Sequence, residues 1–232
     1  MILAEFEVWH SRPIAPTRRL ALGLMHLPVD PVPGFGGVLL AAVLSVHVRE
    51  VDDDVVADVH RLLNEVERGQ RVVQPRLRHR FQADRHGLAV SVHRLSGEGD
   101  SITFAFGNGG TALQQVLGSI YVLERLEVNT RRELARLMRK AMSWRGPLGS
   151  SFVAYLMGGH ASSISAVADP RAWALETLGF PSGTVKVTKK DVMAKYRESL
   201  RIAHPDHGGN EDNASNAIRD LTEARRVLLE TL

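Results

Sequence analysis

The tripeptide formed by His204, Pro205 and Asp206 places an imidazole and a carboxylate in one short polar segment. Proline has no amide hydrogen and disfavours helical geometry in the residue before it, so a helix is expected to end at His204. Gly208 and Gly209 then allow the chain to reverse its direction. The pattern predicts a loop with exposed polar side chains. Because such tripeptides are also common as simple helix stops and turns, the flanking sequence has to decide what this loop is for.

Two amphipathic segments flank the predicted loop. The apolar residues before it recur every three or four positions, as on one face of a helix: Val192, Tyr196, Leu200 and Ala203. Thr188 and Asp191 resemble a capping box, so this helix is expected to begin near Lys189. The apolar residues after the loop have the same spacing: Ile218, Leu221, Ala224, Val227 and Leu228. The sequence therefore predicts an antiparallel helical hairpin with a polar tip.

Together these residues resemble the J-domain family, the co-chaperones of DnaK-type heat-shock ATPases. The resemblance runs from about Asp169 to Leu229 and includes three further segments. Residues 173–180 resemble the family's first helix, residues 194–197 its helix II signature and residues 221–228 its helix III. Asp169 and Pro170 suit the start of the first helix as N-cap and first-turn proline, and Gly179 suits its C-terminal end.

The resemblance implies that the C-terminal region binds a DnaK-type ATPase and stimulates its ATP hydrolysis. In this interpretation Asp206 offers its carboxylate to a cationic side chain of the ATPase, and Pro205 stiffens the loop beside it. Basic residues on the outer face of helix II meet acidic surface on the same partner, which predicts a strong dependence on salt. The expected chaperone-binding residues are His204, Pro205, Asp206, Arg197, Arg201, Lys189, Lys190 and Lys195.

Some residues depart from the family pattern. The outward positions of helix II that usually carry partner-binding basic residues fall on Met193, Arg197 and Glu198, and only Arg197 keeps the expected charge. Arg225 occupies a helix III position where the family usually has tyrosine. These departures favour a weaker or differently tuned contact. They also leave open a second reading, in which the hairpin is degenerate and the chain is a nucleic-acid- or protein-binding module.

A cluster of arginines lies in the N-terminal region, where residues 68–94 hold seven arginines and one acid. Strand alternation would place Arg76, Arg78 and Arg80 on one face. Guanidinium groups grip phosphate in a bidentate manner, so this stripe is a candidate phosphate-binding surface. The alternative, which we favour, is an ordinary solvated face, because no aromatic side chain on that face could stack a base.

Signatures of catalysis and of cofactor binding are missing from the sequence. The glycine-rich run from Gly107 to Gly110 lacks the Lys-Ser/Thr of a nucleotide-binding loop, and neither Ser150 nor Ser151 has the glycine spacing of a nucleophile elbow. The histidines form no zinc signature, and Asp52 to Asp54 fit a helix N-terminus better than a metal site. We therefore expect a protein that is not an enzyme, with no cofactor and no metal.

Composition sets broad limits on the protein. With 232 residues, 44% of them apolar, the chain can bury a sizeable core. It has no cysteine, which excludes disulfides and thiolate zinc sites and fits a reducing cytoplasm. The acidic N-terminal segment does not resemble a signal peptide, and the longest mostly apolar run, Val38 to Val48, is too short to cross a bilayer. The net charge of +3 is only mildly basic.

The N-terminal region, residues 1–160, is predicted to be a mixed α+β domain. Alternation predicts strands over residues 2–8 and 20–24, and a three-strand meander over residues 76–81, 88–95 and 101–106. Residues 28–37 are expected to form a loop. Apolar spacing predicts helices over residues 52–68, 111–124 and 130–144, the last with a capping box made by Thr130 and Glu133, and a short helix within residues 146–159. Small and polar residues from 158 to 165 are the expected linker.

The sequence thus predicts an α+β protein of two parts, with an α+β domain followed by an all-α helical hairpin over residues 169–232. It is expected to be a cytoplasmic adaptor. The C-terminal part would stimulate a DnaK-type chaperone, and the N-terminal part would select a client protein or a location. Nucleic acid is a weaker candidate partner, and no membrane partner is expected.

Overall fold

The computed structural model describes residues 1–70, 77–98, 101–157, 167, 169–181, 183–203, 211–230 and 232, apart from the side chains of residues 211–213, 215 and 216. The chain has an α+β fold and divides into two compact units, Met1–Phe152 and Val153–Leu232. The arginine Arg76 and the tripeptide His204, Pro205 and Asp206 lie outside the described residues, as does the expected linker over residues 158–165.

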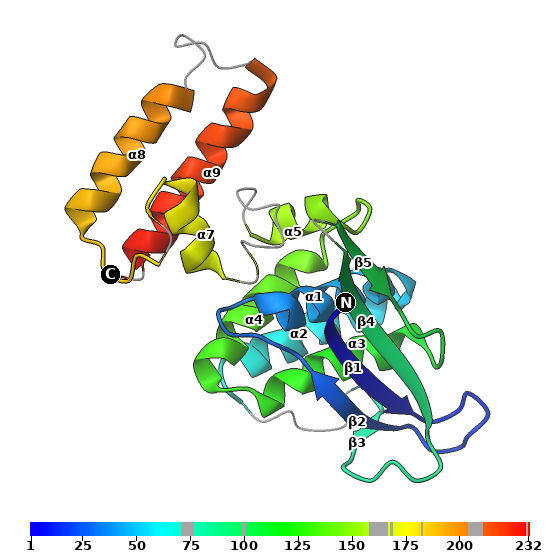
Figure 1. Cartoon of the computed structure of the whole chain (residues 1–232). Helices are drawn as coiled ribbons and strands as arrows, with labels where there is room; N and C mark the ends of the chain where they lie inside the picture. The colour runs from blue at the N-terminus through cyan, green and yellow to red at the C-terminus, as the bar shows by residue number, and fades with distance from the viewer. Residues whose placement is uncertain are drawn as a thin grey trace. The chain divides into compact units, whose positions relative to one another are not determined.

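The N-terminal unit is built on a five-stranded sheet of order β3-β2-β1-β4-β5 (Figure 1). Its strands are β1 (Ile2–His10), β2 (Arg19–His26), β3 (Arg80–Phe81), β4 (Ala89–Glu98) and β5 (Ser101–Ala105). The central strand β1 is antiparallel to both β2 and β4, and β5 extends the sheet as a hairpin with β4. The edge strand β3 is parallel to β2.

The expected three-strand meander is wrong. Its second and third strands form the β4–β5 hairpin, but β3 lies at the opposite edge of the sheet, where Arg80 pairs with Arg19 and Phe81 with Leu20. Sequence alternation reports which side chains of a strand face inward and carries no information on its neighbour. The inward-facing ring of Phe81 packs against Tyr121, with ring centroids 4.8 Å apart, so the hydrophobic core holds β3 at this edge.

The helices of this unit are α1 (Gly34–His47), α2 (Asp53–Glu67), α3 (Ala112–Val122) and α4 (Val128–Ala141), with short 3-10 turns η1 (Val48–Glu50) and η2 (Leu123–Arg125). Helix α5 (Ser150–Leu156) contains the position in the sequence where the chain divides into its two units. Helices α1 and α3 contact the sheet directly, and α2 and α4 pack together. The alternating residues Ala4, Phe6 and Val8 of β1 are fully buried beneath this helical layer, as their spacing predicts. The close approach of α3 depends on Gly118, where an added Cβ would lie 2.6 Å from a methyl group of Val8.

Two local expectations need correction. Helix α1 already begins at Gly34, so the expected loop over residues 28–37 is shorter than the glycines and prolines indicate. Thr130 does not cap α4, because that helix begins at Val128 and Thr130 lies within its first turn. A capping box does form at α3, where the Thr111 hydroxyl accepts from the Gln114 amide and the Gln114 side chain accepts from the Thr111 amide.

The C-terminal unit holds α7 (Pro170–Thr177), α8 (Lys189–Ala203) and α9 (Glu211–Glu230). Helices α8 and α9 lie side by side and run in opposite directions (Figure 1), and α9 also packs against α7. Their shared core contains eight buried residues: Ala174, Leu175, Leu178, Val187, Val192, Leu221, Ala224 and Leu228. None of the helices in the described part of the chain combines the length and apolarity that a membrane crossing requires.

Candidate functional site

Helix α7 has defined signals at both ends. The Asp169 carboxylate accepts a hydrogen bond of 2.8 Å from the Ala172 amide, and Pro170 occupies the first turn, where a missing amide hydrogen costs nothing. Past the other end, Gly179 has a φ of +73°, a left-handed conformation that a side chain would strain. Both ends are where the sequence predicts them.

The predicted capping box determines where helix α8 begins. The Thr188 amide donates to the Asp191 carboxylate over 3.0 Å, and the Asp191 amide donates to the Thr188 hydroxyl over 3.3 Å. The Thr188 hydroxyl also donates to the same carboxylate. These hydrogen bonds from Thr188 lower the pKa of Asp191, because they favour its ionised form. The cap fixes where α8 begins and therefore which of its residues face outward.

The inner face of α8 is anchored by Val192 and Tyr196. Val192 is fully buried, and Tyr196 packs against the shared core with its hydroxyl 3.4 Å from that of Thr222 in α9. The guanidinium of Arg225 lies 4.6 Å from the centre of the Tyr196 ring, a cation–π arrangement. This contact links α9 to α8.

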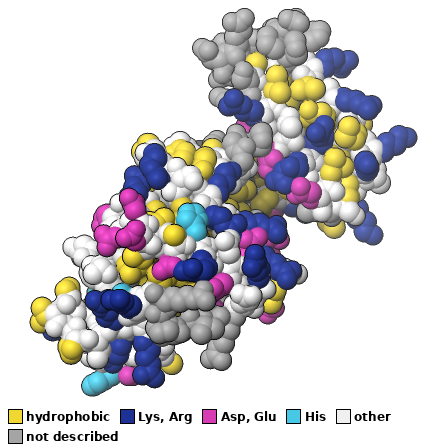
Figure 2. Space-filling view, turned by 180° about the vertical axis from the view of Figure 1, so that it is seen from behind, with side chains coloured by type: hydrophobic (Ala, Val, Ile, Leu, Met, Phe, Trp, Pro, Cys, Tyr) yellow, Lys and Arg dark blue, Asp and Glu magenta, His cyan; other side chains and the backbone are white. Residues whose placement is uncertain are grey.

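The outer face of α8 is basic. Lys189, Lys190, Arg197 and Arg201 are exposed, whereas Lys195 is half-buried and pairs with Glu198 at 3.1 Å. In Figure 2, Lys and Arg side chains line the outer edge of the C-terminal unit along α8. Five basic residues stand against two acidic ones in this helix, and both acidic residues already have a partner within the chain. This face therefore carries a net positive charge.

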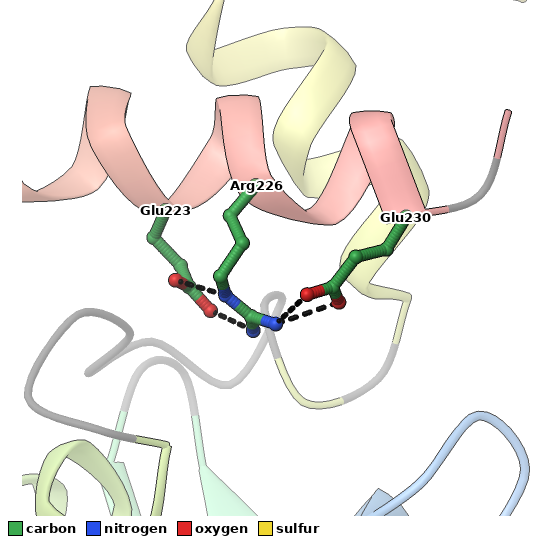
Figure 3. A network of polar contacts seen from close by, with 3 residues as sticks. All are labelled: Glu223, Arg226 and Glu230. Carbon is green, nitrogen blue, oxygen red and sulfur yellow. Dashed lines mark hydrogen bonds and ion pairs between the residues drawn. The ribbon is translucent and has the colours of Figure 1, made fainter.

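A second charged feature, which the sequence reading did not anticipate, lies on α9. Arg226 donates two hydrogen bonds to the Glu223 carboxylate and two to Glu230, three and four residues away along the helix (Figure 3). Both carboxylates raise the pKa of Arg226 further above its usual value. The i, i+3 and i, i+4 spacing of these residues is the signal that could have revealed the network. The network has one guanidinium and two carboxylates and so carries a net charge of −1, and both carboxylates hold its single cation.

The predicted arginine stripe exists only in part. Arg78 and Arg80 are exposed while His79 between them is buried, as alternation predicts. The strand is only two residues long, however, and Arg78 lies before it with a φ of +58°. Arg76 lies outside the described residues, so the three arginines are not shown to form one continuous stripe.

A buried polar network in the N-terminal unit was also missed. The Ser91 hydroxyl donates to the carbonyl of Gly109 over 2.8 Å, and both Gln115 Nε2 and His10 Nε2 lie within 3.1 Å of that hydroxyl. The Ser91 proton is directed to the Gly109 carbonyl, and the donor in the contact between Ser91 and His10 depends on the tautomer of His10. The network ties the glycine-rich turn to the sheet.

Among the described residues, no group of three His, Cys, Asp or Glu side chains is placed to hold a metal ion. Asp53 and Asp54 lie in the first turn of α2, where their charge complements the helix dipole, and Asp52 precedes them at the N-cap. Comparison of the chain with family models, curated proteins and solved structures finds no match. The function therefore has to be argued from the residues and their arrangement.

Proposed function

We propose that the chain is a J-domain co-chaperone, which stimulates ATP hydrolysis by a DnaK-type chaperone through its C-terminal unit. The observation that carries the proposal is the capped, basic helix α8 packed antiparallel to α9 and followed directly in sequence by His204, Pro205 and Asp206. The proposal assigns the partner contact to this tripeptide and to the outer face of α8. The N-terminal unit would then bring a client or a location to the chaperone.

Electrostatics supports this assignment of roles. A chaperone surface rich in carboxylates would be drawn to Lys189, Lys190, Arg197 and Arg201, which are exposed on α8. Asp206 follows that face by a few residues and would supply one directed, charge-assisted hydrogen bond to a cationic group of the ATPase. The basic face governs encounter and orientation, and the tripeptide transmits the signal for hydrolysis.

A second candidate function is a binding module whose hairpin does not stimulate an ATPase. It is favoured by Glu198, whose exposed carboxylate neutralises Lys195 on the face that should be basic, and by Met193, which is half-buried. We rank it second, because Arg197 and Arg201 keep their charge on the outer face and the tripeptide is intact.

A single-turnover ATPase assay with the host's DnaK-type chaperone separates the two functions. The wild-type chain should raise the rate of hydrolysis, and His204→Gln and Asp206→Asn should each abolish that stimulation while the melting temperature stays unchanged. Asp54→Asn removes an exposed carboxylate from the other unit and serves as the control that keeps stimulation. Variants that stimulate as well as the wild type would reject the proposal, and a large loss of melting temperature would show that the tripeptide is structural.

A further inference from the structure

The face of the sheet that the helices leave uncovered carries an aromatic side chain beside a cluster of arginines. Trp9 lies on this face, because its neighbours Val8 and His10 are buried on the helical side. Its cross-strand partner on β4, Val90, is 40% exposed. An aromatic side chain at the middle of an open sheet face is a surface on which a planar ring can stack.

The arginines reach the same face through the strand register. Trp9 pairs with Ala21, so the alternate residue Arg19 of β2 shares its face, and Arg19 pairs in turn with Arg80 of β3. Leu20 and Phe81, the next pair, point to the core instead. The two-residue strand β3 thereby aligns Arg80 with Arg19 at the edge beside Trp9, and Arg18 and Arg78 are exposed next to them.

The arginine edge of this face, along β2 and β3, has an excess of positive charge. Glu5 pairs with Arg94, and Glu7 accepts hydrogen bonds of 2.9 Å from Trp9 Nε1 and 3.0 Å from the Leu24 amide. In the described part of the chain, none of Arg18, Arg19, Arg78 and Arg80 takes part in an ion pair. The side-chain Nε of Arg19 is buried and has no hydrogen-bond partner among the described atoms. The edge therefore complements a polyanion.

The two sides of the Trp9 indole differ. One edge of the indole packs against Gly23 of β2, where an added Cβ would come within 2.4 Å of Trp9 Nε1. Over the ring lies the guanidinium of Arg85, 5.3 Å from its centre, and this half-exposed side chain is held by Glu7 only at 3.8 Å. A planar cation on an aromatic ring occupies the position that a nucleobase takes when it stacks.

From these observations we propose that the open sheet face of the N-terminal unit binds single-stranded nucleic acid. One base stacks on Trp9 in place of the Arg85 guanidinium, and the backbone phosphates follow Arg19, Arg80 and their exposed neighbours along the β2–β3 edge. A duplex does not fit this arrangement, because its bases are already stacked on one another and cannot reach the indole. An acidic peptide would bind the arginines but would not stack on Trp9. The site is separate from the residues assigned to the chaperone contact, and its existence does not depend on them.

The test measures binding of the full chain to a fluorescein-labelled oligothymidylate of about twelve nucleotides, within the usual site size of such surfaces, by fluorescence anisotropy at low salt. An abasic oligomer of equal length supplies the phosphates without bases. We expect the abasic oligomer and the Trp9→Leu variant each to weaken binding about fivefold or more, with Trp9→Phe close to the wild type. Arg80→Gln should weaken binding and flatten its dependence on salt.

The control is Arg132→Gln, which removes an exposed arginine from helix α4 in the helical layer and should leave affinity unchanged. Circular dichroism of each variant shows whether it is folded. The proposal is overturned if the wild type does not bind at low salt, or if Arg132→Gln weakens binding as much as Arg80→Gln. It is equally overturned if the abasic oligomer, or polyglutamate of similar length, binds as tightly as the oligothymidylate, since the face would then recognise charge alone.

Discussion

At the scale of single residues, His93 gives the N-terminal unit a dependence on pH. It is fully buried on β4, and one ring nitrogen, Nε2, lies 2.9 Å from Gln115 Oε1 while Nδ1 has no partner among the described atoms. Burial lowers the pKa of His93 to about 4, since the charged imidazolium would lose its hydration. His47 and His10 lie near it, and burial lowers the pKa of each in the same direction.

We predict that the unit loses stability as the pH falls from about 6.5 to about 4. In this window the unfolded chain binds a proton at His93 and the folded chain does not. The free energy of unfolding therefore becomes smaller as the pH falls. The loss from this residue is on the order of 3 kcal/mol. Urea unfolding at a series of pH values measures it. His93→Gln should flatten the slope, whereas His86→Gln, at an exposed position, should not; equal slopes for all three proteins would contradict the prediction.

Two helix caps predicted from the same residue spacing had different outcomes. Thr188 and Asp191 predict the start of α8, and the reciprocal hydrogen bonds confirm it. Thr130 and Glu133 have the same spacing, but α4 begins earlier, at Val128. The motif is local and does not by itself decide between two nearby starts of a helix. The Ser91 network could not be predicted from the sequence for a related reason. Gln115 and His10 are distant from Ser91 in the chain and approach it only when the strands and a helix pack together.

At the scale of elements, the C-terminal unit depends on the seam where α9 meets α7 and α8. Leu221 is 6% exposed within the shared core. Leu221→Ala should lower the free energy of unfolding by about 2–5 kcal/mol, because it removes buried methyl groups and leaves a cavity. Urea or thermal unfolding of the full chain measures the change. Ile202→Ala removes a similar side chain that is 68% exposed and serves as the control. A loss below about 0.5 kcal/mol at Leu221 would mean that the apolar face of α9 is misassigned.

Pairing between elements was harder to predict than the elements themselves. Most helices and strands are found within a few residues of their expected positions, because apolar periodicity records which face of each is buried. The partner of β3 is not recorded in this way. Its two residues follow a long excursion through α1 and α2, and their pairing with β2 depends on the contact of Phe81 with Tyr121 of α3. That register brings Arg80 beside Arg19. The candidate surface on the sheet could therefore not be predicted from the sequence.

At the scale of the whole molecule, charge is distributed unevenly although the net charge is only +3. One positive surface runs along the outer face of α8, and another lies at the β2–β3 edge of the N-terminal unit. Neither surface could be inferred from composition, because the compensating acids are elsewhere, for example at the start of α2 and in the Glu223–Arg226–Glu230 network. The two proposals place one anionic partner on each of these surfaces.

The basic face of α8 and the tripeptide are expected to affect the salt dependence of ATPase stimulation differently. Raising the salt concentration from about 0.05 to about 0.5 M shortens the screening length from roughly 14 to roughly 4 Å, which weakens the attraction between separated charges. If α8 steers the chain to its chaperone, the concentration of chain that gives half-maximal ATPase stimulation should rise steeply over this range, while the maximal stimulation changes little. Arg197→Gln combined with Arg201→Gln should flatten that rise, because fewer charges remain to be screened.

The tripeptide variants should behave in the opposite way. Asp206→Asn is expected to remove the maximal stimulation at every salt concentration, because a directed hydrogen bond acts after the encounter has occurred. Arg219→Gln, at an exposed position of α9, is the matched control for the α8 arginines and should keep the wild-type salt dependence. If the double α8 variant retained the steep wild-type dependence, or if Arg219→Gln flattened it equally, steering would not belong to α8. The positive face would then be ordinary solvated surface, and the contact with the chaperone would rest on the tripeptide alone.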